Sequence, residues 1–358
     1  MNTHPISRRT MIRSAAVGAL ALGVAAPLKA AAPPHGKKRL GVSTSSYGVR
    51  WRNGTAELPA FNDALGMIEH CHRLGAGGVQ IGVGGWTPEF ARQVRERIER
   101  YEMFLEGQIG LPRGGADVAR FDREVGQAKE AGVGIIRAVM LGGRRYENFR
   151  TLAAWNEHKE RSWQSLMLAR PVMAKHRIRL AVENHKDWRA EEMVDVIRRA
   201  DSAWIGINLD FGNNLSLLDQ PMAVVETLAP WTLTTHFKDM AVEEYEEGFL
   251  LSEVPLGNGF FDLKAMMVVL DKVRPDVQYN LEMITRDPLE IPVFTDQYWV
   301  TFQELPARHL AESLVMLRKH PPGQPLPRVA GRSMNEQVEF EEQNNVDSFR
   351  YARNELGL

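Results

Sequence analysis

Three acidic side chains and one histidine occur at the ends of four short apolar segments, at a spacing that suits metal binding. These residues are Glu183, Asp210, His236 and Glu282. Each belongs to a run that is typical of a buried strand, and an amphipathic stretch of helical length separates each run from the next. Strands joined by helices run parallel, so their carboxyl ends lie on one face of a sheet. Three carboxylates and an imidazole on that face predict a site for a divalent cation.

Side chains on the same strand faces extend the candidate site. Strand alternation groups His185 with Glu183, and Lys238 with His236. A single buried carboxylate usually makes a structural salt bridge, but three of them at matching strand ends would be costly without a cation. Oxygen and imidazole ligands suit Mn²⁺, Mg²⁺, Co²⁺ or Zn²⁺. Three carboxylates exceed the charge of a divalent ion, and Lys238 could balance the excess or stabilise a developing oxyanion.

The composition is that of an ordinary globular chain. Hydrophobic residues make up 44% and charged residues 25% of the 358 residues, which allows one large α/β domain or two average ones. The 44 basic and 45 acidic residues give a net charge of −1, which excludes a general electrostatic attraction to nucleic acid. The single cysteine, Cys71, excludes internal disulfides and thiolate metal clusters.

Residues 1–32 have the pattern of a twin-arginine export signal. Arg8 and Arg9 precede an uncharged apolar run over residues 15–28, and small residues follow at 30–32. The run is too short to span a bilayer comfortably, which favours cleavage near Ala30–Ala32 over an uncleaved anchor. We therefore expect a periplasmic protein with no stable membrane insertion after cleavage.

Strand and helix patterns alternate regularly through the rest of the chain. Strands are expected over residues 39–47, 78–82, 104–109, 135–141, 179–185, 204–210, 233–239 and 277–282. Helices are expected over residues 58–74, 87–103, 116–131, 156–176, 190–200, 220–228, 262–273 and 306–320. Eight strands alternating with eight helices predict a single α/β domain, a (β/α)8 TIM barrel over residues 37–320. A doubly wound sheet is the alternative, but the first strand is not followed by a Gly-rich turn.

Two insertions and a tail stand outside this alternation. Residues 241–259 and 285–304 follow the last two strands and would lie over the mouth of the barrel, where Trp299 could contact a substrate or only cap the barrel. A Pro-rich connector opens the segment 321–358, and Ser333 begins a capping-box pattern. We expect a tail helix that docks on the barrel or on a neighbouring copy, with a frayed end as the alternative.

The four candidate ligands resemble the metal quartet of the xylose isomerase-like barrel superfamily. That superfamily includes sugar isomerases, ketose 3-epimerases, inosose dehydratases and the endonuclease IV group. The segments 183–188, 236–240 and 280–288 more closely resemble its sugar phosphate isomerase/epimerase subgroup, which contains 3-oxo-isoapionate decarboxylase. The endonucleases and 3-epimerases carry histidine where this chain has Asn213, and strands two and three offer Gln80 and Glu106 in place of the further nuclease histidines. These departures argue against a nuclease.

The resemblance implies a metal-dependent isomerase or epimerase that acts on a keto-sugar or sugar acid through a metal-stabilised enediolate. A decarboxylase or lyase on a 3-keto sugar acid or 3-keto-glycoside is the alternative, and a non-catalytic sugar-binding barrel is a further one. Glu183 and Glu282 would serve as both ligands and acid–base groups, and His185 or Lys238 could supply a proton.

The partner expected from this resemblance is a small carbohydrate, not a nucleic acid, and a homo-oligomer stays open. We expect the substrate to contact Arg137, Asn213, Glu106 and Trp299. For Arg137, a salt bridge to Glu106 is the alternative.

Overall fold

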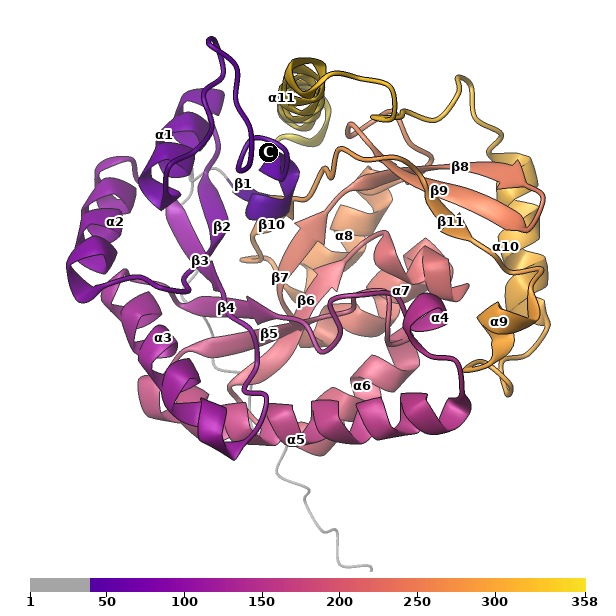
Figure 1. Ribbon diagram of the computed structural model, residues 1–358, viewed down its shortest axis with the longest axis horizontal. Coiled ribbons are helices and arrows are strands. Elements are labelled where there is room, and N and C mark those ends of the chain that lie inside the picture. Colours follow the sequence, from indigo (N-terminus) through magenta and orange to yellow (C-terminus); the bar gives the residue numbers. More distant parts are fainter. Residues whose placement is uncertain (1–38) are drawn as a thin grey trace, which may run out of the picture.

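The computed structural model describes residues 39–358 and shows a closed barrel of eight parallel strands surrounded by helices (Figure 1). The barrel strands are β1 (Leu40–Ser43), β2 (Gly78–Gly82), β3 (Phe104–Gln108), β4 (Ile135–Ala138), β5 (Arg179–Glu183), β6 (Ile205–Asp210), β7 (Thr232–Phe237) and β10 (Tyr279–Leu281). They follow one another around the barrel in chain order, and β10 closes it by pairing with β1 and β7. The predicted (β/α)8 barrel is confirmed. The predicted export signal lies outside the described residues.

Seven helices connect the barrel strands at the expected places, and an eighth, α10, follows the last barrel strand. They are α1 (Ala64–Leu74), α2 (Pro88–Arg100), α3 (Val118–Glu130), α5 (Leu152–His176), α6 (Ala190–Ala200), α7 (Pro221–Leu228), α8 (Leu263–Val273) and α10 (Arg308–Lys319). Shorter helices are α4 (Arg145–Asn148), α9 (Asp296–Trp299), η1 (Thr44–Tyr47), η2 (Gly115–Asp117), η3 (Asn213–Leu217), η4 (Ala229–Trp231) and η5 (Ala352–Leu356). Local sequence sets the helix ends. The Thr87 side chain accepts from the Phe90 N–H at the start of α2, and Gly75 ends α1 at φ +92°.

The barrel interior is polar, except at the amino-terminal end of the strands, where the ring of Phe104 closes it. Phe104 at the start of β3 lies so close to β1 and β2 that a Cβ on Gly78 would stand 2.3 Å from its ring, which is why glycine is required there. Above it, Glu106 accepts hydrogen bonds from Thr234 and Asn280 across the barrel. Interior layers of such barrels are usually aliphatic, so a buried polar network is unusual here. The residues at the mouth of the barrel account for it.

Two segments differ from the prediction. The first strand ends at Ser43 rather than at residue 47, because residues 44–47 turn into η1 and leave the pairing with β2. The insertion after β7 is not a loop: β8 (Asp239–Tyr245) and β9 (Gly248–Val254) form a hairpin, and β11 (Leu289–Ile291) from the second insertion pairs with it. The result is a three-stranded antiparallel sheet beside the barrel (Figure 1).

The tail forms the long helix α11 (Met334–Tyr351), which docks on its own barrel. Ser333 and Glu336 form the predicted capping box. The Glu341 carboxylate accepts from the backbone N–H groups of Val49 and Arg50 at 2.7 and 2.9 Å, and the Asn345 side chain donates to the Ser46 carbonyl. These contacts lie in the segment that follows β1, so α11 covers part of the barrel mouth. The helix is anchored rather than frayed.

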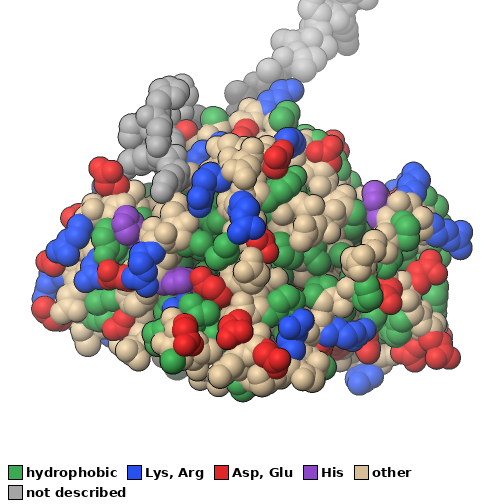
Figure 2. All heavy atoms as spheres, turned by 90° about the horizontal axis from the view of Figure 1, so that it is seen from above, with side chains coloured by type: hydrophobic (Ala, Val, Ile, Leu, Met, Phe, Trp, Pro, Cys, Tyr) green, Lys and Arg blue, Asp and Glu red, His purple; other side chains and the backbone are tan. Residues whose placement is uncertain are grey.

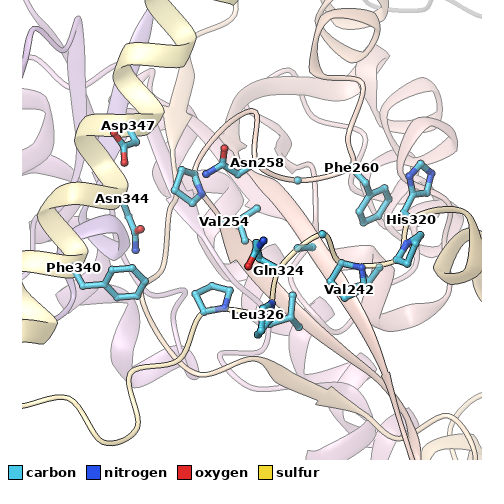
Figure 3. A pocket seen from close by; sticks show the side chains of 18 of the residues that line it. Val242, Val254, Asn258, Phe260, His320, Gln324, Leu326, Phe340, Asn344 and Asp347 are labelled. Carbon is cyan, nitrogen blue, oxygen red and sulfur yellow. The ribbon is translucent and has the colours of Figure 1, made fainter.

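The surface carries no large field of one charge on the face seen in Figure 2, where basic and acidic side chains are intermixed. Across residues 39–358, no helix combines the length and the apolar character that crossing a membrane requires. A cavity of about 890 Å³ lies between the β8–β9 hairpin, the Pro-rich connector and α11 (Figure 3). None of the four predicted metal ligands lines it.

Candidate metal centre

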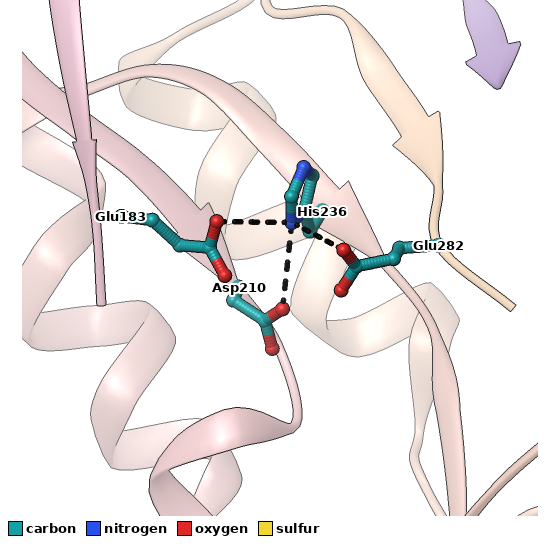
Figure 4. Close-up of side chains that lie close together, drawn as sticks. All are labelled: Glu183, Asp210, His236 and Glu282. Carbon is teal, nitrogen blue, oxygen red and sulfur yellow. Dashed lines mark ion pairs between the residues drawn. The ribbon is translucent and has the colours of Figure 1, made fainter. Parts of the chain in front are cut away.

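The four predicted ligands meet at the carboxyl ends of β5, β6, β7 and β10. Nδ1 of His236 lies 3.3 Å from Glu183, 3.7 Å from Asp210 and 3.2 Å from Glu282, measured to the nearest carboxylate oxygen (Figure 4). One atom from each residue lies within 4.8 Å of the others, and all four side chains are buried. Ligands bonded to one cation at roughly 2.1 Å stand about 3 to 4 Å apart, so the spacing fits a shared ion. Within the described residues, this is the one cluster of three or more such groups.

The hydrogen bonding of His236 tests whether the residues suit a cation. Nε2 lies 2.7 Å from the Gln80 side-chain oxygen, which can only accept, so Nε2 carries a proton. Nδ1 is buried and has no hydrogen-bond partner. A bare nitrogen lone pair facing three carboxylates would be repelled, and a proton or a metal ion at that point removes the repulsion. The donor set therefore fits a divalent cation.

Backbone and side-chain donors hold the carboxylates in place. Oδ1 of Asp210 accepts from the N–H groups of Gly212 and Asn213 at 2.9 and 2.8 Å, which leaves Oδ2 directed toward the centre. Oε1 of Glu183 accepts from the Asn213 side chain at 3.0 Å, and Oε2 contacts the Arg137 guanidinium. Such support fixes the orientation of ligands before a metal arrives.

Lys238 lies between two of the acidic ligands. Its ammonium stands 2.8 Å from Asp210 and 2.5 Å from Glu282. Glu253 on β9 is 3.9 Å from the same ammonium and pairs with Arg286 at 2.5 Å. The hairpin beside the barrel thus contributes a buried acid to the surroundings of the centre.

Charge coupling keeps the acids ionised despite burial. Burial favours the neutral acid, but Arg137 and His236 outweigh it and lower the pKa of Glu183 below its ordinary value. The pKa of Glu282 is likewise held well below its ordinary value, by His236 and Lys238 against the effect of burial. Burial would lower the pKa of His236, but Glu282 and Glu183 raise it well above its ordinary value. Without a metal, a proton on Nδ1 satisfies the centre.

His185 lies next to the four ligands in a neutral form. Nδ1 donates to the Gly143 carbonyl at 3.2 Å, because a carbonyl can only accept, and Nε2 is left as an acceptor. Burial, reinforced by the Lys186 ammonium, lowers the pKa of His185 to about 3. At neutral pH this ring can accept a proton or a hydrogen bond, but it is no source of a proton from an imidazolium.

The residues predicted to contact substrate occupy different places. Arg137 pairs with Glu183, so the alternative salt bridge to Glu106 is wrong. Asn213 bridges Glu183 and Lys186. Glu106 lies a layer deeper, where its hydrogen bonds go to Gln80, Thr234 and Asn280. The Trp299 indole donates to the Val293 carbonyl within its own insertion. Their contacts with a substrate stay predictions.

Sequence reasoning missed three charged neighbours of the centre, Lys186, Glu253 and Arg286, and it named Gln80 without its hydrogen bond to His236. Gln80 lies on β2, which carries none of the predicted metal ligands. Only the closure of the barrel in three dimensions brings its side chain to His236. Strand alternation would have placed Lys186 on the face opposite Glu183, but β5 ends at Glu183 and the alternation ends with it. Glu253 belongs to the hairpin that was expected to be a loop.

Comparison with known proteins agrees with this fold. The family model described as xylose isomerase-like TIM barrel matches residues 68–319. A relative, 3-oxo-isoapionate decarboxylase of Pectobacterium atrosepticum, is 26% identical over 232 residues, covering 63% of this chain and 79% of that protein.

Two solved structures share the fold at low sequence identity. D-psicose 3-epimerase, in the presence of D-fructose, has a TM-score of 0.54 at 14% identity, covering 80% of this chain and 100% of that one. The 3-keto-D-glucoside 4-epimerase YcjR of E. coli, in its apo form, has a TM-score of 0.52 at 14% identity, covering 79% and 100%. With the family model spanning most of the barrel and the quartet assembled at its mouth, this chain belongs to the xylose isomerase-like TIM barrel family.

Proposed function

We propose that this protein is a divalent-metal-dependent isomerase or epimerase that acts on a keto-sugar or sugar acid. The observation that carries the proposal is the convergence of three buried carboxylates on Nδ1 of His236, while Nε2 is committed to Gln80. Glu183, Asp210, His236 and Glu282 would hold the ion. When bound, a divalent cation there would polarise a substrate ketone and its neighbouring hydroxyl, which lowers the cost of removing a proton from the carbon between them.

Two of the ligands are also suited to move that proton. Glu183 and Glu282 come from β5 and β10, which flank β6 and β7, so they approach the centre from different directions. Their lowered pKa values keep both as carboxylates, the form that accepts a proton. Lys238 bonds to Glu282 and stays protonated, because Asp210 and Glu282 raise its pKa against the effect of burial. It would return a proton or stabilise charge on a substrate oxygen.

A decarboxylase is the second candidate, and the name of the relative from Pectobacterium atrosepticum favours it. Loss of CO₂ from a β-keto acid needs a polarised ketone and one proton donor. Because His185 is neutral, Lys238 is the better donor of the two residues that the sequence offered. The two reactions share the same binding of the ketone and differ in which bond breaks.

The predicted export signal bears on the choice of substrate. The twin-arginine pattern in residues 1–32 supports a periplasmic location, and we propose that location on the sequence alone. Sugar phosphates are mostly cytoplasmic, so a free or glycosidic 3-keto sugar or a sugar acid suits the periplasm better.

Proton exchange in D₂O tests the proposal. The metal-loaded protein is incubated with a panel of keto-sugars and keto-acids, and proton NMR follows the C–H signal next to the ketone. We expect that signal to disappear, EDTA to stop the loss, and Glu282→Gln to slow it by about 100-fold or more. Glu290→Gln, an exposed position on β11, is the matched control. Release of CO₂ without exchange in the recovered substrate would favour the decarboxylase, and binding with neither reaction would contradict both enzymes.

A further inference from the structure

Among residues 39–358, Lys186 is a buried cation without an acidic partner. Its residue is 3% exposed. The other buried basic residues of the described chain all form ion pairs: Arg50 with Glu342, Arg145 with Glu192, and Lys238 with Asp210 and Glu282. No carboxylate within the described residues lies in ion-pair range of Lys186. An unpaired buried ammonium is costly, so a negative group from outside the protein would complete it.

Its position links this ammonium to the candidate metal centre. Nζ donates to the Asn213 side-chain oxygen, and the nitrogen of the same amide donates to Glu183 at 3.0 Å. The Lys186 carbonyl accepts from the Arg145 N–H at 2.8 Å, which fixes the backbone. An ammonium has three N–H donors, and in the part of the chain that the structure describes only the Asn213 side chain accepts a hydrogen bond from it. The remaining donors lie one amide away from a metal ligand.

The charge balance of the centre points the same way. The acids that form ion pairs around the centre are Glu183, Asp210, Glu253 and Glu282, and the cations near them are Arg137, Lys186, Lys238 and Arg286. These eight charges cancel. Glu106 and Asp187 are also buried nearby, but burial raises the pKa of both carboxyls, so a divalent ion would leave the loaded centre with a net positive charge. Burial, followed by repulsion from Arg286 and Lys238, lowers the pKa of Lys186 to about 8. A negative group on the substrate would relieve both effects.

We propose that Lys186 binds a carboxylate of the substrate, so that the substrate is a keto-sugar acid rather than a neutral sugar. This inference rests on the proposed function and narrows its substrate class. A carboxylate carries one charge and two acceptor oxygens, which match one ammonium with two open N–H groups. A phosphate shares the anionic chemistry. It carries more charge than this single ammonium and more acceptor oxygens than the ammonium has open N–H groups.

Binding calorimetry on the Mn²⁺-loaded protein tests the inference with three sugars of one carbon skeleton. They are D-fructose, D-fructuronate and the terminal phosphate ester of D-fructose, which differ only at the last carbon. We expect D-fructuronate to bind at least about tenfold more tightly than D-fructose, and Lys186→Met to reduce the ratio of the two affinities to about one. Formate, as the smallest carboxylate, should raise the Tm of the wild type above the value in chloride and should not do so in Lys186→Met.

Lys175→Met is the matched control, since it removes the same charge from an exposed lysine that pairs with Asp122. The inference is overturned if the acid and the neutral sugar bind equally tightly, or if the preference for the acid survives Lys186→Met. It is also overturned if D-fructuronate does not bind and formate does not raise the Tm. Tighter binding of the phosphate ester overturns the carboxylate in favour of a phosphate. Deuterium exchange into D-fructose without any preference for the acid would retain the proposed function and reject this inference. A preference for the acid that depends on Lys186, without any deuterium exchange, would retain this inference and reject the proposed function.

Discussion

At the scale of single residues, the candidate metal centre depends on which nitrogen of His236 is free. The Gln80 side chain settles this, because its oxygen accepts from Nε2 while its nitrogen donates to Glu106 and Asn208 at 3.1 and 3.2 Å. Those two acceptors fix the orientation of the amide. The polar network inside the barrel therefore has a role at the mouth: it holds the imidazole so that Nδ1 faces the carboxylates.

Removing this support should weaken metal binding without removing a ligand. We expect Gln80→Leu to lower the affinity for Mn²⁺ by about 10- to 100-fold, because the ring loses its fixed orientation and its tautomer. Isothermal titration of the metal-stripped protein measures the affinity. Gln93→Leu, at an exposed position on α2, is the control. An affinity within twofold of the wild type would show that Gln80 does not position His236.

The sequence predicted the residues of the quartet because each stands at the same place in a repeated unit. Strand alternation and the parallel arrangement then suffice to bring Glu183, Asp210, His236 and Glu282 together. The same logic fails for Lys186, which lies beyond the end of β5, and for Gln80, which acts across the barrel. Contacts made beyond the end of a strand, or across the interior of the barrel, depend on closure of the whole barrel.

At the scale of elements, the tail helix is the least expected part of the mouth. Its capping box was readable from residues 333–336, but its docking place was not, because the anchoring carboxylate of Glu341 binds backbone N–H groups and no side-chain pattern marks those. The antiparallel sheet was missed for a related reason. Residues 241–259 follow a barrel strand, and their short alternating pattern does not by itself distinguish a hairpin from an irregular insertion.

Loss of the Glu341 anchor should destabilise the fold. In Glu341→Ala, the buried N–H groups of Val49 and Arg50 lose their acceptor, and we expect the free energy of unfolding to fall by about 2 to 4 kcal/mol. Urea unfolding measures the change. Glu339→Ala on the exposed side of α11 should change it by less than about 0.5 kcal/mol. Equal effects of the two substitutions would show that α11 does not hold the segment after β1.

At the scale of the whole molecule, the closed barrel brings together groups that are about a hundred positions apart in the chain. Glu183 and Glu282 meet at one nitrogen because β5, β6, β7 and β10 are consecutive in the barrel. Phe104 closes the floor, the polar network fills the middle, and the hairpin and α11 surround the mouth. The fold thus encloses a charged centre that no single element could keep away from solvent.

Titration of Mn²⁺ into the metal-stripped protein, in two buffers of different ionisation enthalpy, tests the central claim most directly. Because His236 has a raised pKa, it is protonated at neutral pH without metal, so each bound ion must displace about one proton, and the affinity must fall as the pH is lowered. We predict one ion per chain with release of about one proton, and loss of both in His236→Gln. Absence of a bound ion, or unchanged binding in that variant, would contradict a metal centre at the mouth of this barrel.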